Sequence, residues 1–186
     1  PLLLVVAKLT TLCEVSFCAH FEKKIELDGY KFDSEKEAHF YQRFIKNCGR
    51  NYKIHPTYPL LDKFPVGGYN MRGISYTPDF IIYEEGEIAH VYDVKTSLDA
   101  RAIDTAAKIR FKLFAHRYHM PVEVVVPRKN DFKMKVFNFG NTKVQAAHAK
   151  HDRKGNVKTY KNGHIMYDYY DVHKTVNYNL HDTIGF

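Results

Sequence analysis

The sequence predicts an α/β domain built on a mixed β-sheet, followed by a basic, β-rich C-terminal extension. Two observations carry this prediction. The expected elements between residues 34 and 126 run helix, strand, strand, strand, helix, strand, an order typical of sheets flanked by helices. The chain also has 186 residues, of which 45% are apolar. That is enough for one compact domain with a hydrophobic core, and it excludes a disordered or fibrous chain.

The first elements are marked by turn and capping residues. Asp28-Gly29 lies between two short segments of alternating apolar and polar residues, which predicts a β-hairpin. Ser34 is a favourable helix N-cap, and Glu37 three residues later completes a capping box. An apolar stripe follows at helical spacing, and Gly49 is expected to end the helix.

The remaining core elements follow from apolar patterning. Residues 54–61 should be extended, and 73–83 and 88–96 should form two neighbouring strands joined by a glycine-containing turn. The Ala-rich, basic segment 99–119 predicts a helix that ends before a proline. The apolar run 122–126 predicts a buried strand.

Basic charge is concentrated towards the C-terminus. The chain has 28 Lys and Arg against 21 Asp and Glu, a formal charge of +7. Residues 128–161 contain ten basic and two acidic side chains, so this stretch carries +8 and the rest of the chain −1. An anionic partner is therefore expected, and the alternative is that these lysines only keep the protein soluble. Residues 134–139 predict one more strand, and Asn162-Gly163 predicts a hairpin turn.

The predicted organisation has three parts. Residues 1–20 are expected to form an arm or strand, because their apolar start lacks the basic residues and cleavage pattern of a signal peptide. Residues 21–127 would form the core, and 128–186 a basic extension packed on it. No run approaches the roughly 18 apolar residues of a membrane span. Three cysteines without paired spacing favour a reduced setting, so the expected location is the cytoplasm.

The residues expected to carry chemistry are Asp79, Asp93 and Lys95. Side chains alternate along a strand, so Asp93 and Lys95 should share one face while Val94 points into the other layer. Asp79 begins the preceding strand, at a distance along the chain that suits a hairpin. Two adjacent strands would thus bring two carboxylates and one ammonium to the same end of a sheet.

Such a cluster has a definite chemistry. Two carboxylates a few ångströms apart repel each other unless a cation lies between them. Oxygen ligands with open positions suit Mg²⁺ or Mn²⁺, which also accept a phosphate oxygen. A divalent ion lowers the pKa of a bound water that can attack phosphorus, and Lys95 would orient that water or neutralise charge on the phosphate. The alternative is an exposed hairpin with ordinary surface charges.

Glu37 and several basic residues are further candidates. Glu37 borders the apolar stripe of its helix and can reach the end of a sheet, although it would cap the helix without any other role. Lys108 and Lys112 lie on one helix face with Asp104, either towards a phosphate or in surface ion pairs. The expected nucleic-acid-binding residues are Arg101, Lys108, Lys112, Arg128, Lys129, Arg153 and Lys154.

These motifs resemble those of the PD-(D/E)XK nuclease superfamily. The resemblance rests on Glu37 in a first helix, on Thr77-Pro78-Asp79-Phe80 and on Asp93-Val94-Lys95, followed by a basic helix and an apolar strand. The segment from Leu27 to Ala38 also resembles the start of a phage-encoded endonuclease-like family within that superfamily. Together the similarity covers roughly residues 21–126.

The resemblance implies a fold and a reaction. The fold is a restriction-endonuclease-like core with the element order αβββαβ, in which helices flank a mixed central sheet. The reaction is hydrolysis of phosphodiester bonds in DNA, including branched or structured phage DNA, with Mg²⁺ or Mn²⁺ and without a nucleotide cofactor. A homodimer is one way to provide the two sites that cleavage of both strands needs.

The resemblance also implies residue roles. The expected catalytic residues are Glu37, Asp79, Asp93 and Lys95. The expected metal ligands are Asp79, Asp93, Glu37 and Val94. Asp93 stands where many members have glutamate, and its shorter reach would change the metal spacing. Fold alone does not fix activity, so a non-catalytic nucleic-acid-binding or protein-interaction module is the alternative. The presence of Asp79, Asp93 and Lys95 together favours the enzyme.

Overall fold

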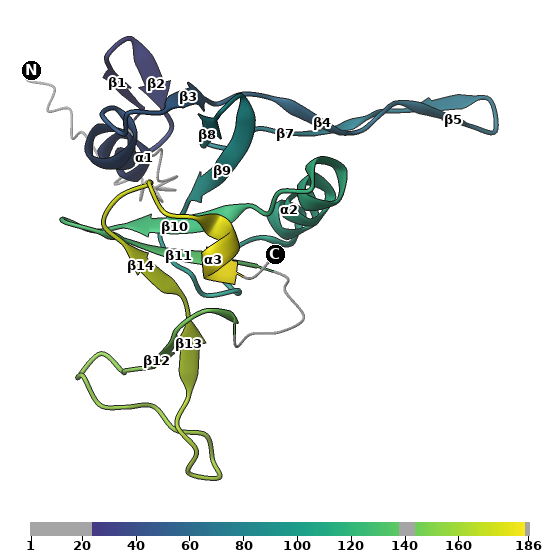
Figure 1. Ribbon diagram of the computed structural model, residues 1–186. Coiled ribbons are helices and arrows are strands. Elements are labelled where there is room, and N and C mark those ends of the chain that lie inside the picture. The colour runs from purple at the N-terminus through teal and green to yellow at the C-terminus, as the bar shows by residue number, and fades with distance from the viewer. Residues whose placement is uncertain (1–23, 138–143, 185–186) are drawn as a thin grey trace, which may run out of the picture.

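The centre of the protein is a six-stranded mixed β-sheet (Figure 1). The computed structural model describes residues 24–137 and 144–184, so the expected arm over residues 1–20 lies outside the described residues. In spatial order the strands are β14 (Asp171–His173), β11 (Phe132–Val136), β10 (Glu123–Pro127), β9 (Glu87–Val94), β8 (Phe80–Glu84) and β3 (Asn51–Ile54). Only β9 and β10 pair in parallel, which confirms the predicted α/β class with a mixed sheet.

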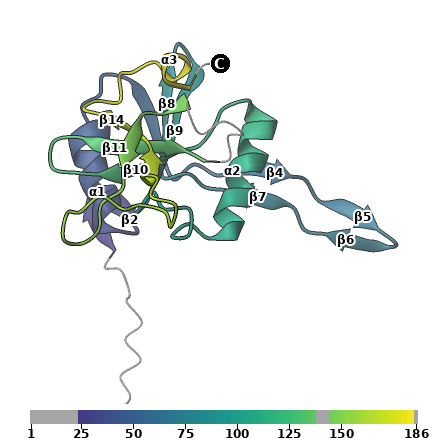
Figure 2. The ribbon, with the colours of Figure 1, turned by 90° about the horizontal axis from the view of Figure 1, so that it is seen from below.

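Helices cover both faces of this sheet (Figure 2). Helix α1 (Glu35–Phe40) continues as the π-turn η1 (Tyr41–Ile45) on one face, and α2 (Thr105–Tyr118) lies on the other. Side chains of β9 alternate between two apolar clusters, with Tyr92 under α1 and Val91 under α2. The sheet is therefore buried on both faces, as its apolar strands require.

The start of α1 forms as the sequence predicts. The hairpin of β1 (Ile25–Leu27) and β2 (Tyr30–Phe32) precedes it. Ser34 caps the helix and its Oγ accepts the Glu37 N–H at 3.2 Å. The regular α-helix ends earlier than Gly49, because the Lys46 N–H donates to the Tyr41 carbonyl and closes a π-turn.

Replacing Ser34 with alanine should lower the free energy of unfolding by about 1 kcal/mol, since the cap loses its side-chain acceptor. Urea unfolding followed by circular dichroism measures this change. The matched control is Ser75→Ala on the exposed strand β7 (Ile74–Tyr76), where we expect a change within about 0.5 kcal/mol. Equal effects of the two substitutions would contradict a capping role for Ser34.

The strand expected over residues 73–83 is in fact two strands, which corrects the sequence prediction. Strand β7 pairs with β4 (Tyr58–Leu61), whereas β8 pairs with β3 and β9. Pro78 lies in the gap and has no N–H to donate to a ladder. The interruption leaves Asp79 at the end of the central sheet, outside the regular strand.

Before this gap, between β3 and β8, the chain forms a long two-stranded arm. Strands β5 (Phe64–Val66) and β6 (Tyr69–Met71) continue the β4–β7 ribbon away from the body of the protein (Figures 1 and 2). Its tip is apolar yet exposed, with Tyr69 79% exposed.

Helix α2 begins later than the sequence predicts, at Thr105 rather than near residue 99. Asp104 is the N-cap, and its side chain accepts the Ala107 N–H at 2.8 Å. The preceding residues are held in a turn, in which the Arg101 N–H donates to Asp99. The predicted end before Pro121 is confirmed, since His119 takes a left-handed conformation.

The C-terminal segment joins the central sheet and also forms a small ladder beside it. Strands β11 and β14 extend the sheet, while β12 (Ala147–Ala149) pairs with β13 (Tyr167–Tyr169). The predicted turn at Asn162-Gly163 is confirmed, with Gly163 at φ +83°. Helix α3 (Leu180–Ile184) buries its first and last side chains. Residues 138 and 139 of the expected strand 134–139 lie outside the described residues.

None of the helices in the described segments is both long and apolar enough to cross a membrane.

Candidate metal centre

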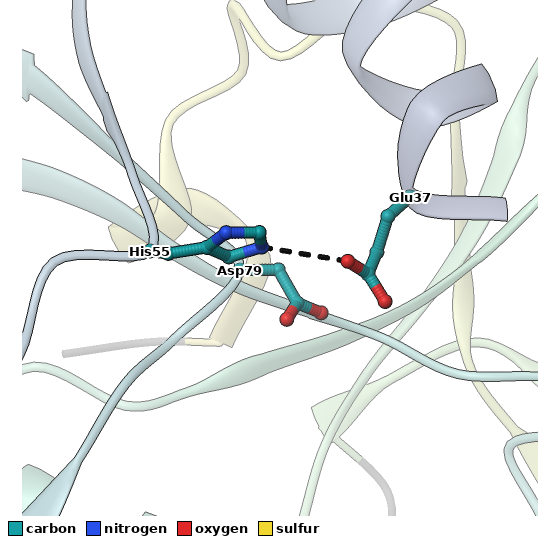
Figure 3. A group of neighbouring side chains, drawn as sticks. All are labelled: Glu37, His55 and Asp79. Atoms are coloured by element: carbon teal, nitrogen blue, oxygen red, sulfur yellow. Dashed lines mark ion pairs between the residues drawn. The ribbon is translucent and has the colours of Figure 1, made fainter. Parts of the chain in front are cut away.

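Three side chains from different elements converge at one end of the central sheet (Figure 3). Glu37 comes from the first turn of α1, His55 follows β3 and Asp79 precedes β8. One donor atom from each lies within 4.8 Å of the others. The register of β3 and β8 explains the meeting: Ile54 lies opposite Phe80, so the next residues along are neighbours.

Glu37 is positioned by the helix start itself. The Ser34 hydroxyl donates to Oε1 at 2.9 Å, and the Asp33 N–H donates to Oε2 at 3.1 Å. The side chain is buried, at 7% exposure. The capping role is therefore confirmed, and the same contacts hold this carboxylate near His55 and Asp79, while its role in a metal site stays a prediction.

A negative charge on Asp79 is unfavourable in the metal-free site. Asp79 Oδ2 accepts the Val94 N–H at 2.5 Å, which favours the carboxylate. Burial raises its pKa well above the usual value, and the nearby Asp93 and Glu37 carboxylates raise the pKa further. A cation at this position would remove the penalty.

Asp93 and Lys95 lie on the same face of the sheet, as strand alternation predicts. Asp93 is buried, accepts the Tyr76 hydroxyl at 2.9 Å through Oδ2, and pairs with the Lys95 ammonium through Oδ1. Val94 is buried in the cluster on the opposite face. Burial lowers the pKa of Lys95, but Asp93 and Asp79 outweigh it and leave that pKa raised. Lys95 is therefore a cation and not a general base at neutral pH.

The sequence places Asp79, Asp93 and Lys95 within one coordination sphere, whereas the described geometry divides them. Asp79 belongs to the group with Glu37 and His55, and Asp93 forms a pair with Lys95. The two parts adjoin, since Asp79 accepts the main-chain N–H of Val94, the residue between Asp93 and Lys95. Val94 itself contributes only main-chain atoms and a core side chain here.

His55 is the site residue that sequence reasoning missed. It was included in an extended segment, and no spacing motif distinguishes it from the other ten histidines. The feature that places His55 beside Asp79 is the register of β3 and β8, and this register depends on tertiary structure. His55 has φ +49° and its N–H donates to the Asp79 carbonyl at 3.1 Å. A left-handed residue before Pro56 is strained, as is common at functional sites.

The donor set suits a divalent cation. His55 Nε2 lies 3.4 Å from Glu37 Oε2, and that carboxylate raises the pKa of His55 against the effect of burial. Among the described residues, two buried atoms in this region make ion pairs but no hydrogen bond: His55 Nε2 and Asp93 Oδ1. The carboxylates suit Mg²⁺ or Mn²⁺, whereas the imidazole is a nitrogen ligand that transition-metal ions accept more readily than Mg²⁺ does.

A cavity of about 470 Å³ lies beside Glu37 and Lys95, at one side of this group. Glu37, Val94, Lys95 and Thr96 line it, together with the residues that begin α1. A substrate can therefore approach the Glu37 carboxylate and the Lys95 ammonium from solvent, whereas Asp79 and Asp93 do not line this cavity.

The region that builds this site is also the region shared with a protein family. Residues 19–135 match the family described as "Protein of unknown function (DUF1064)". The chain belongs to this family. The match includes every residue of the candidate metal centre and most of the central sheet, and it ends within β11. No curated protein and no solved structure matches the chain.

In this DUF1064 protein the basic residues predicted to bind nucleic acid are spread over several surfaces. Arg101 and Arg128 pair with nearby aspartates, and the Lys108 ammonium contacts the Ala100 carbonyl. Lys112, Lys129, Arg153 and Lys154 are exposed. None of these predicted residues lines the cavity at the candidate metal centre. Their proposed contacts with phosphate stay predictions.

Proposed function

We propose that this DUF1064 protein is a divalent-metal-dependent endonuclease that hydrolyses phosphodiester bonds in DNA. The observation that carries the proposal is the cluster of buried carboxylates beside a charged lysine, at an open cavity where the sheet ends. Buried groups with strongly shifted pKa values in a cavity mark candidate catalytic sites.

The arrangement of the elements supports the resemblance to the PD-(D/E)XK superfamily. Helix α1 is followed by the antiparallel strands β3, β8 and β9, then by α2 and the parallel strand β10. This is the αβββαβ order that the resemblance implies for a restriction-endonuclease-like core. The motif residues Asp79, Asp93 and Lys95 lie where β8 begins and β9 ends.

The chain's own groups have separate roles in the proposed reaction. Glu37, Asp79 and Asp93 would hold Mg²⁺ or Mn²⁺, with His55 as a nitrogen donor. When bound, the ion would polarise the scissile phosphate and lower the pKa of the attacking water. Lys95 stabilises the negative charge that builds on the phosphate, because it stays protonated. Tyr76 fixes Asp93 through its hydroxyl.

The alternative, a non-catalytic binding module, explains these residues less well. A binding surface for phosphate does not need buried acids, which repel phosphate and destabilise the fold when no cation is present. Asp79 and Asp93 both lie at the cavity end of the sheet, and each has a specific polar partner. Two buried carboxylates held by specific partners are therefore better explained by a metal site than by a phosphate-binding surface.

The test is a cleavage assay with supercoiled, linear and branched DNA in Mg²⁺ or Mn²⁺. We expect the wild type to cleave at least one substrate, and EDTA, Asp93→Ala and Lys95→Ala each to stop it. Linear product without a nicked precursor would favour a homodimer with paired sites. If the wild type and both variants leave every substrate equally intact, the protein is not a nuclease. Cleavage that persists in both variants would assign it to another site or a contaminant.

A further inference from the structure

A second cavity, also of about 470 Å³, lies next to the metal site. We call it the basic cleft and define it by Thr96, Ser97, Lys133, Lys150, Lys158 and Tyr170. One wall is the segment that leaves β9 directly after Lys95, and the other is formed by β11 and by the chain around β12 and β13. The C-terminal segment thus builds a cavity together with the end of the active-site strand.

The basic cleft adjoins the cavity at the metal centre. Thr96 lines both cavities, and it follows Lys95 directly in the chain. A polymer whose phosphate lies beside Lys95 would therefore extend past Thr96 and Ser97 into the cleft.

The cleft carries an unbalanced positive charge. Lys133, Lys150 and Lys158 line it, and within the described ranges none of them forms an ion pair. Two aspartates also line the cleft, but both have cationic partners. Asp99 pairs with Arg101 at 2.9 Å and Asp168 with Lys135 at 3.0 Å. The three lysines are thus available to an anion.

The wall beside these lysines is held in place by ring contacts. Tyr170 stacks on His148 with ring centroids 3.9 Å apart, and the Lys133 ammonium lies 4.5 Å from the Tyr170 ring centroid. The His148 ring also contacts the Tyr170 carbonyl through Nε2 at 3.0 Å. Because the Tyr170 and His148 rings are already paired with each other, this wall offers the lysine cations and the hydroxyls of Thr96 and Ser97 to phosphates.

We infer that the basic cleft binds the sugar–phosphate backbone of one DNA strand next to the scissile bond, so that substrates with a single-stranded segment are preferred. The inference rests on the proposed nuclease function and specifies its substrate class. A walled cavity of this volume accepts one strand, whereas the strands of a duplex are held apart across grooves roughly 12 Å and 6 Å wide. A flap or branch would place its free strand in the cleft.

The experiment measures binding of the full chain to a short labelled single strand in EDTA, over a series of salt concentrations. The cleft variant carries Lys133→Gln, Lys150→Gln and Lys158→Gln. The matched control carries Lys31→Gln, Lys63→Gln and Lys174→Gln, three exposed lysines remote from the cleft lining, and so has the same net charge. Circular dichroism checks that both variants are folded. If the triple cleft variant is not folded, the single variant Lys150→Gln replaces it in the binding measurement.

We expect the cleft variant to bind about tenfold or more weakly and to lose about two units of the salt slope, roughly 0.7 for each phosphate contact on a single strand. The control should bind like the wild type. Equal binding by the two variants would overturn the cleft assignment, even if metal-dependent cleavage is found. Equal wild-type affinity for a duplex of the same sequence would overturn the preference for a single strand.

The two proposals can fail separately. If the wild type cleaves nothing with any metal while the cleft variant still loses single-strand binding, the proposed hydrolysis is wrong and the cleft assignment is supported. If cleavage is found, a flap substrate should be cut faster than a blunt duplex by the wild type. The cleft variant should reduce that preference mainly through a higher KM.

Discussion

Replacing Asp79 with asparagine should abolish DNA cleavage and at the same time make the metal-free protein more stable. The variant removes the ionisable carboxyl of Asp79, whose negative charge is opposed by burial and by the nearby Asp93 and Glu37 carboxylates. Asparagine still offers an oxygen to the Val94 N–H, so the local geometry is retained. We expect cleavage to fall about 10³-fold. The free energy of unfolding in EDTA should rise by about 1 kcal/mol, a size common for stabilising substitutions.

The stability difference should depend on pH in a defined direction. Burial and the neighbouring carboxylates raise the folded-state pKa of Asp79 above its unfolded value of about 4, so folding favours the protonated form. The stability associated with this group is present below about pH 4 and is lost as pH rises through the folded pKa. The gap between Asp79→Asn and the wild type should therefore widen from pH 4 upwards.

Urea unfolding at several pH values, with and without Mg²⁺ or Mn²⁺, measures this effect. Asp62→Asn is the matched control, because Asp62 is exposed on the arm and pairs with Arg117. It should change neither cleavage nor the pH dependence. Added metal should stabilise the wild type and not Asp79→Asn. A variant that is less stable than the wild type in EDTA at neutral pH would contradict the repulsion on which the metal centre depends.

The parts of the site that could be predicted are those encoded by neighbouring residues. The Ser34 and Glu37 cap is local, and so is the alternation that places Asp93 and Lys95 on one face. His55 could not be found in this way. It reaches Asp79 only because β3 pairs with β8 in one register, and that pairing spans more than twenty residues of intervening arm.

The basic extension shows the same distinction. Composition located the excess charge between residues 128 and 161, but it did not show which lysines face one cavity. Lys150 and Lys158 meet because the Lys158 N–H donates to the Lys150 carbonyl, within the irregular pairing that surrounds β12 and β13. Lys133 joins them from a strand of the central sheet. Grouping of these side chains depends on pairing between segments far apart in the chain, which cannot be predicted from composition.

Replacing Glu123 with alanine should have the largest effect on stability and little effect on chemistry. Glu123 and His90 are fully buried on the parallel strands β10 and β9, with His90 Nδ1 2.9 Å from Glu123 Oε1. Glu123 Oε2 accepts the hydroxyl of Tyr178, whose main-chain carbonyl lies 3.1 Å from His90 Nε2. Burial and the Glu123 carboxylate raise the pKa of Tyr178 well above its usual value, so the hydroxyl stays a donor.

Alanine would leave two buried polar groups, the His90 ring and the Tyr178 hydroxyl, without their Glu123 partner, which should cost about 3–5 kcal/mol. Urea unfolding measures the loss, and limited proteolysis should show earlier cleavage near Tyr178, where the C-terminal segment is attached. Glu87→Ala on the exposed start of β9 is the control and should change stability by about 0.5 kcal/mol or less. A loss below about 1 kcal/mol for Glu123→Ala would show that water or a side-chain shift satisfies the network.

Asp79→Asn and Glu123→Ala are expected to have opposite effects on stability and on DNA cleavage. Comparing them tests whether separate residues determine stability and function in this protein. Glu123 lies on β10 beside the strand that carries Asp93, since Val124 is paired with Asp93 in the parallel ladder. It does not line the cavity beside Lys95, and its carboxylate contacts His90 and Tyr178 instead. At a temperature where Glu123→Ala is still folded it should therefore cleave DNA at a rate close to the wild type. Asp79→Asn should be more stable in EDTA and inactive. If Asp79→Asn were instead destabilised, and each variant lost activity only to the extent that it lost stability, the carboxylates at the sheet end would have a structural role only.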